Sequence, residues 1–400
     1  MRPQFTLSQL VMAVWLVAIV LGLVMSDVFS IRFCKVSDLA FSPDGEHVAA
    51  ARRDARGAGA DNILDDVSRT ISILNAATGR MERIVERAVP SRDQGSLSDR
   101  YSYSHPQKTV AFGLQGKTLL VQQFRGGGVK TYDLVSGQWG YTVKGSPSGR
   151  DMSFAVTPDG TRAAVIVAGS LISWDVGTGQ TKAMANPGTR DADRWYDPPR
   201  IAISSDGSIC AIADVSAVYL RNAADGSAGA SVCGVAGEDT VLRLALSPNG
   251  RMLAVVFWKS LKLYDLTSLR ITEFAAGRWM ENIAFSPDGK ILAVADGKHV
   301  DLMEVASGRT IRSVRSDGYA TSVACSPKQE LLAVGDGDGC VTLWNTVTGD
   351  KIWTTMAPGN PAVSWVWSVL SLLLWIAVWR ITVIRRRKAR QAQASPSPGG

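Results

Sequence analysis

Closely spaced histidines and cysteines are absent from this 400-residue chain, and their absence limits the metal chemistry that we expect. The three histidines, His47, His105 and His299, never form a His-x-x-x-His pair. None of the five cysteines belongs to a Cys-x-x-Cys pair. Zinc sites draw their ligands from such closely spaced residues. The sequence therefore predicts no metal-binding residue.

Motifs that activate a nucleophile or hold phosphate are also lacking. There is no Gly-x-Ser-x-Gly elbow, and the glycine run at residues 126–128 does not open a helix. Residues 336–339 (Asp-Gly-Asp-Gly) resemble the start of a calcium loop, but no glutamate follows at the distance of the bidentate ligand. We therefore expect no catalytic residue and no cofactor-binding residue.

Excess positive charge is confined to the two ends of the chain. The formal net charge is +7, whereas the lysines and arginines of the body only balance its acidic residues. A nucleic-acid-binding protein spreads its positive charge over a folded face, so we expect no nucleic-acid partner. The residues that carry the excess are Arg2, Arg380, Arg385, Arg386, Arg387, Lys388 and Arg390.

Two long apolar runs flank the body and predict two transmembrane helices. Residues 5–25 are long enough to cross about 30 Å of hydrocarbon as a helix. Residues 362–379 form the second run, which extends to 384 if Arg380 snorkels. A buried core helix is the alternative for either run. A cleaved signal peptide is the alternative for the first, although no small-x-small cleavage site follows it.

The basic cluster at residues 385–390 sets the expected orientation, because positive residues favour the cytoplasmic side. Two spans then place both termini in the cytoplasm and the body on the extracytoplasmic side of the inner membrane. We expect an N-terminal anchor and tether (1–35), a repeat body (36–357), a C-terminal transmembrane helix (358–384) and a basic, disordered cytoplasmic tail (385–400).

The body is an internal repeat. Alternating apolar residues stand on both sides of a recurring Ser/Thr-Pro-Asp-Gly turn, which predicts strand, tight turn, strand. Copies of the turn occur at residues 42–45, 157–160, 204–207, 247–250 and 286–289, with weaker copies at 114–116 and 326–329.

A second signature follows each of these turns: an aromatic residue and an acid, then Thr/Ser-Gly. Its clearest copies begin at Tyr132, Trp174 and Trp344. The paired signatures resemble tryptophan-aspartate (WD) repeats, and the resemblance implies an all-β, seven-bladed β-propeller over residues 36–357. No Gly-His dipeptide begins a repeat, so the family's buried histidine network is expected to be missing. Whether residues 29–34 add a strand that latches the ring stays open.

The cysteines are odd in number and are expected in strands that do not adjoin. Cys210 and Cys233, in a second and a fourth strand, would lie about 9.6 Å apart, beyond the roughly 7 Å that a disulfide spans. We expect free thiols, with the pairing of any two left open. The cysteines are Cys34, Cys210, Cys233, Cys325 and Cys340.

The longest connections, residues 52–69, 88–107 and 187–199, all belong to the class that this family places on the top face. Aromatic residues and arginines anchor protein interfaces, so we expect partner-binding residues in these connections and in shorter loops beside them. The alternative is that these side chains only cap the blades. The candidates are Tyr101, Tyr103, Arg190, Arg194, Trp195, Tyr196, Trp258 and Trp279.

The resemblance implies a non-catalytic propeller that acts as a binding platform for a protein or ligand. We expect it to be tethered to the membrane, with its top face toward the bilayer and a protein partner that lies in or near it. Residues 5–10 resemble the N-terminal anchors of bacterial membrane proteins. The alternative is an enzyme with a redox cofactor in the central channel, because residues 348–353 are similar to the repeat of quinoprotein dehydrogenases.

Overall fold

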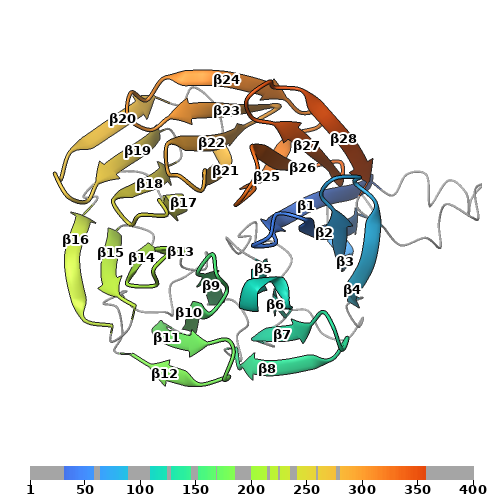
Figure 1. The fold of residues 1–400 in the computed structure, drawn as a ribbon, viewed down its shortest axis with the longest axis horizontal. Coiled ribbons are helices and arrows are strands. Elements are labelled where there is room, and N and C mark those ends of the chain that lie inside the picture. The colour runs from blue at the N-terminus through green and yellow to red at the C-terminus, as the bar shows by residue number, and fades with distance from the viewer. Residues whose placement is uncertain are drawn as a thin grey trace, which may run out of the picture. The chain divides into compact units, whose positions relative to one another are not determined.

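The described part of the chain forms a ring of seven four-stranded antiparallel sheets (Figure 1). The structure is a computed structural model. It describes residues 31–57, 64–88, 109–123, 128–145, 152–167, 169–184, 200–213, 217–223, 226–234, 241–257, 260–275 and 280–356. All of them lie in the first of two units, Met1–Ala357. The expected all-β, seven-bladed propeller is confirmed.

Each blade is built from four consecutive strands, which pair in sequence order from the inside of the ring outward. Blade 1 contains β1 (Ile31–Phe41), β2 (His47–Gly57), β3 (Leu64–Asn75) and β4 (Met81–Ala88), and blade 2 contains β5 (Val110–Gly113), β6 (Thr118–Gln122), β7 (Val129–Asp133) and β8 (Trp139–Val143). Blade 3 contains β9 (Met152–Val156), β10 (Arg162–Val167), β11 (Ser170–Asp175) and β12 (Thr181–Ala183), and blade 4 contains β13 (Arg200–Ile203), β14 (Ile209–Ala213), β15 (Ala217–Asn222) and β16 (Ala228–Gly234). Blade 5 contains β17 (Val241–Leu246), β18 (Met252–Phe257), β19 (Ser260–Asp265) and β20 (Ile271–Ala275), and blade 6 contains β21 (Met280–Phe285), β22 (Ile291–Asp296), β23 (His299–Glu304) and β24 (Thr310–Arg315). Blade 7 contains β25 (Ala320–Cys325), β26 (Leu331–Asp336), β27 (Cys340–Asn345) and β28 (Lys351–Met356).

The recurring turn joins the first two strands of a blade through its own side chains. In blade 6, Ser286 Oγ donates to Asp288 Oδ1 at 2.6 Å, and Asp288 Oδ1 also accepts the N–H of Lys290 at 3.0 Å. Blade 2 lacks these residues and turns through the short 3₁₀ helix η1 (Leu114–Gly116). There the backbone N–H groups of Leu114 and Gln115 donate to the turn of blade 3, at 3.0 and 3.1 Å. The neighbouring blade thus supplies the bonds that the degenerate turn cannot make.

The core lies between the blades. Seven apolar clusters are present among the described residues, and each joins two adjacent blades around the ring. Trp174 is completely buried between blades 2 and 3. Within the part that the structure describes, the indole nitrogens of Trp174 and Trp344 have no hydrogen-bond partner. These orphan donors agree with the absence of the family's histidine, which would otherwise join the buried network.

Large side chains of the outer strands pack on glycines of the next blade. Tyr141 and Phe274 cover Gly179 and Gly308 so closely that neither glycine has room for a Cβ. Between blades 7 and 1, Trp353 covers the glycine at position 79 in the same way, at 2.7 Å from the place of a Cβ. The packing therefore continues around the ring.

The ring closes between blades 7 and 1 without a shared strand in the described residues. β1 pairs with β2, and β25–β28 already complete blade 7, so the open question of a latching strand is answered. Three contacts hold this seam. Trp353 Nε1 donates to the carbonyl of Ala76 at 2.8 Å, Thr321 Oγ1 donates to the carbonyl of Val36 at 2.6 Å, and an apolar cluster spans the two blades.

Blade 1 has longer strands than the other blades. β1 and β2 pair from Phe41↔Val48 to Ile31↔Gly57, and β2 and β3 from His47↔Asn75 to Gly57↔Leu64. Most of the connection expected at residues 52–69 is therefore strand, because the pairing continues past the end of the core. No helix among the described residues is long and apolar enough to cross a bilayer. The expected spans at 5–25 and 362–384 lie outside the described residues.

Candidate functional site

The residues expected to bind a partner all lie outside the described part of the chain. We call the face where the first strand of each blade begins the upper face, which corresponds to the expected top. Because neighbouring strands are antiparallel, β1 begins and β28 ends on this face. The candidates outside the described residues are Tyr101, Tyr103, Arg190, Arg194, Trp195, Tyr196, Trp258 and Trp279.

Tyr319 is an exposed aromatic residue of the upper face that the sequence analysis missed. It lies in the connection between β24 and β25, and 65% of its surface is exposed. Lys298, in the turn between β22 and β23, places its Nζ 5.8 Å from the centre of the tyrosine ring. Its position in a connection between blades, the same class as Trp279, was the signal that could have identified it.

A row of basic side chains crosses the upper part of blade 1. Lys35 of β1 stands opposite Arg53 of β2, which in turn stands opposite Arg69 of β3. We call these three residues the cationic row. Like charges directly opposite one another in a sheet repel, so the row must be stabilised by groups from elsewhere. At its outer end, Arg69 is buried and pairs with Glu86 at 2.7 Å.

The inner end of the cationic row reaches across the ring. Lys35 Nζ lies 3.5 Å from Glu281 Oε2 of β21, although blades 1 and 6 are separated by blade 7. Glu281 is the extra residue of a β-bulge between Met280 and Asn282, a feature that re-aims a side chain. Burial lowers the pKa of Lys35, an effect that Glu281 opposes and that Arg243 of blade 5 and Arg53 reinforce. Residues of blades 1 and 6 thus meet at one end of the central channel, which we call the channel mouth.

Asp38 joins the inner strand of blade 1 to the beginning of blade 2. Its Oδ2 accepts the N–H groups of Thr109 and Val110 at 2.6 and 2.9 Å, and its Oδ1 accepts the N–H of Leu39 at 2.9 Å. Asp38 is 4% exposed. Hydrogen bonds from three backbone groups explain how a buried carboxylate is tolerated there.

The thiols of Cys34 and Cys340 lie on two strands that adjoin at the seam. β1 and β27 belong to different sheets, and they contact one another where closure of the ring brings the ends of the repeat together. Arg52 donates to Cys34 Sγ at 3.1 Å and packs beside Gly339, next to Cys340. Cys210, Cys325 and Cys340 are free thiols.

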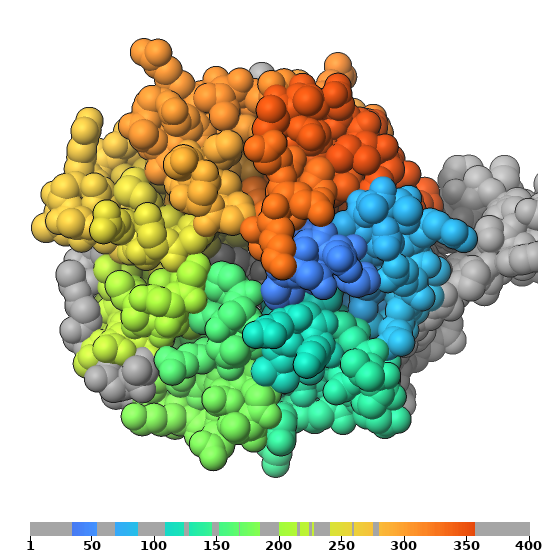
Figure 2. Space-filling view, viewed as in Figure 1, coloured from blue at the N-terminus to red at the C-terminus, as the bar shows by residue number. Residues whose placement is uncertain are grey.

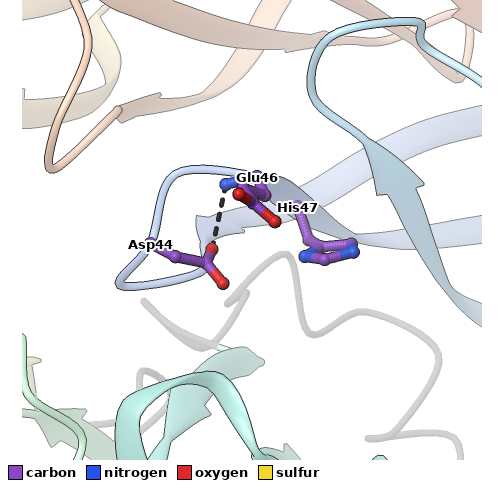
Figure 3. Close-up of side chains that lie close together, drawn as sticks. All are labelled: Asp44, Glu46 and His47. Carbon is purple, nitrogen blue, oxygen red and sulfur yellow. Dashed lines mark hydrogen bonds between the residues drawn. The ribbon is translucent and has the colours of Figure 1, made fainter.

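One group of potential metal ligands occurs in the described residues: Asp44, Glu46 and His47, whose ligand atoms lie within 4.8 Å of one another (Figure 3). Asp44 Oδ1 accepts the N–H of Glu46 at 2.9 Å, as the acid of this turn does in other blades. His47 Nε2 pairs with Glu82 at 3.0 Å. These contacts account for Asp44 and His47 as parts of a turn and its neighbouring strand, and we assign no metal to the group.

Trp353, which suggested a redox enzyme, has a structural role. Its indole ring packs on blade 1, and its Nε1 bonds to the carbonyl of Ala76. Trp353, the last residue of the motif at residues 348–353, thus takes part in closing the ring.

Comparisons with known proteins agree with this architecture. The WD40 family, described as "WD domain, G-beta repeat", matches residues 308–345, which contain the outer strand of blade 6 and the three inner strands of blade 7. No curated protein sequence matches the chain. A solved chain of Kuenenia stuttgartiensis hydrazine synthase has a similar fold, with a TM-score of 0.57 and 15% identity over 79% of this chain and 96% of that chain. The chain is thus a seven-bladed β-propeller that contains a WD40 repeat.

Proposed function

We propose that the propeller is a non-catalytic platform that binds a protein partner on its upper face. The observation that carries this proposal is the asymmetry between the two faces. The turns of the lower face repeat the same internal bonds from blade to blade. The upper face instead carries the lengthened strands of blade 1, the exposed Tyr319 and the charged channel mouth. Figure 2 shows the blades packed side by side around the ring. Features that break a structural repeat are candidates for recognition.

The platform of this proposal is held on the extracytoplasmic side of the inner membrane by residues 5–25 and 362–384. The apolar runs and the basic cluster at 385–390 support it. Since β1 begins and β28 ends on the upper face, both tethers would leave from that face. Protease added to intact spheroplasts should digest residues 36–357 and spare a C-terminal tag. Protection of the propeller would contradict the orientation.

Site-specific photo-crosslinking tests the binding face. A photoreactive residue at position 319, 65% exposed, should give a discrete adduct with a partner in native membranes that contain the full-length protein. The matched control is Leu269, a 72% exposed residue in the turn between β19 and β20 on the opposite face. Adducts from position 269 alone, or from neither position, would refute the proposed face.

The alternative is an enzyme with a redox cofactor in the channel. Trp353 is engaged at the seam, and the likeness to hydrazine synthase at 15% identity concerns the fold alone. The absorption spectrum of the purified full-length protein tests this alternative. A stoichiometric absorbing cofactor would contradict the non-catalytic role.

A further inference from the structure

We propose that the outer edge of blade 6 is a docking site for an extended acidic segment of a partner protein, which adds to β24 as a further strand. The inference goes beyond the platform role, because it concerns the outer rim of the ring and not its upper face. β24 is the outermost strand of its blade (Figure 1), and among the described strands it pairs with β23 alone. The free edge of such a strand presents backbone N–H and C=O groups to which another strand can bind.

The side chains of β24 divide into a packed set and an exposed set. Val314 belongs to the apolar cluster between blades 6 and 7, and Arg312 donates to the carbonyl of Thr348 in blade 7 at 2.8 Å. Both side chains therefore point toward blade 7. Ile311, which is 53% exposed, and Arg315 remain exposed on the rim. The strand thus offers a partner one apolar and one charged side chain.

The positive charge of this edge is not balanced by neighbouring acids. Arg309, in the turn before β24, and Arg315, at its end, are both exposed and form no ion pair within the described part of the chain. Asp301 stands opposite Ser313 in the β23–β24 ladder, but it pairs with neither arginine. A carboxylate from another molecule can therefore bind these arginines without displacing one that the propeller already holds.

The outer strands of the two neighbouring blades differ in this respect. In blade 5, Glu273 of β20 pairs with Lys262 at 3.7 Å. In blade 7, Lys351 of β28 pairs with Asp317 at 2.8 Å. The charged side chains of these two edges have partners inside the propeller, whereas the exposed charges of the blade 6 edge are left for a ligand.

The two arginines also determine which occupant fits. Antiparallel pairing of β24 with the same strand of a second copy would bring Arg309 of one copy beside Arg315 of the other, and like charges placed opposite one another repel. Edge charges hinder pairing with basic strands in the same way. Arginine binds a carboxylate through a planar pair of donors. The segment that fits therefore carries an apolar residue beside Ile311 and an acidic residue near each end.

Fluorescence anisotropy of a labelled peptide tests the proposal on the full-length protein in detergent micelles. The probe is Asp-Thr-Val-Thr-Val-Thr-Asp, which is about as long as β24 when extended, and the control peptide has lysine in place of both aspartates. The acidic peptide should bind, and the lysine peptide should not. Arg309→Gln and Arg315→Gln should each weaken binding about two- to fivefold, as the loss of an exposed ion pair does. Ile311→Ser should weaken it by a similar factor.

The matched control variant is Ile271→Ser. Ile271 is 52% exposed at the start of β20, but that strand also carries Glu273, which repels an acidic segment. The affinity should therefore stay within about 1.5-fold of that of the parent protein. The double variant Arg309→Glu/Arg315→Glu should lose the acidic peptide and gain the lysine peptide. A misfolded variant would not gain a ligand, so this exchange separates a lost contact from a lost fold.

Methylation of the peptide's backbone amides tests the pairing itself. Successive N–H groups of a strand point to opposite edges, so methylation of either the valine amides or the threonine amides, but not of both sets, should weaken binding about tenfold. Equal affinity of both methylated peptides would mean attraction by charge alone and would overturn strand addition. The proposal is also overturned if the acidic peptide does not bind, or if Arg309→Glu/Arg315→Glu fails to bind the lysine peptide.

Discussion

Trp353 is the side chain whose replacement tests how the ring is closed. Trp353→Phe removes the hydrogen bond to the carbonyl of Ala76, 2.8 Å long, and should cost about 1–2 kcal/mol of unfolding free energy. Trp353→Ala also removes the packing on Gly79. A fully buried Trp→Ala change costs about 3–5 kcal/mol. Because Trp353 is only partly buried, we expect about 3 kcal/mol for Trp353→Ala, including the hydrogen bond.

Hydrogen exchange of the full-length protein, followed by mass spectrometry, shows which strands the Trp353 variants destabilise. No chain connection joins blades 7 and 1, so both Trp353 variants should increase exchange mainly in β1 and β28. Phe274→Ala is the matched control, because Phe274 packs on Gly308 between blades 5 and 6, which the chain does connect. The reasoning is refuted if β1 and β28 exchange no faster in Trp353→Ala than in Phe274→Ala.

Three further predictions follow from local contacts. Gly308→Ala should lower the melting temperature more than Gly250→Ala, because both have φ +68° but only a methyl group at 308 overlaps a neighbouring phenylalanine ring; equal losses would contradict this. Hydrogen bonds from the turn serine and a backbone N–H lower the pKa of Asp288, so its contribution to stability is present above about pH 4 and is lost as the pH falls through the folded-state pKa. Asp288→Asn should preserve stability at neutral pH, because Asn249 makes the same bonds at this place in blade 5. The variant should also lose less stability than the parent protein in acid. An unchanged pH profile of thermal unfolding would contradict this prediction. Burial raises the pKa of Cys210 and Cys325 to about 12, so both thiols should resist maleimide at pH 8 until the protein unfolds, as read by peptide mass spectrometry; rapid labelling of the folded protein would count against it.

The repeat could be predicted because its signals are local. The turn at residues 286–289 and its flanking apolar strands lie within one short segment, and the same holds for the other copies. The lengthened strands of blade 1 could not be predicted in this way, since residues 52–57 have no alternating apolar pattern and pair because β1 continues beside them. The contact between Lys35 and Glu281 joins residues 246 positions apart. Only closure of the ring brings them together.

The residues that hold the seam were recognisable only in part. Trp353 belongs to the motif at residues 348–353 that suggested a quinoprotein repeat, but the sequence did not reveal that its indole nitrogen donates to blade 1. Six of the eight candidates were chosen from long connections, and only Trp258 and Trp279 from short ones, whereas Tyr319 lies in a short connection. Selecting candidates by loop length favours residues of long connections. Whether a side chain is exposed depends instead on where its connection ends.

Closure without a shared strand has a consequence for synthesis on the ribosome. Every sheet can form as soon as its own four consecutive strands have emerged, because sheet pairing never waits for a distant segment. The flank of blade 1 that bears Val36, Leu39 and Val48 is different, because blade 7 covers it and is made last. This apolar surface is therefore exposed throughout translation of the intervening blades, and exposed apolar surface of this kind promotes aggregation. A nascent chain that stalls before β25 is the species that most needs a chaperone.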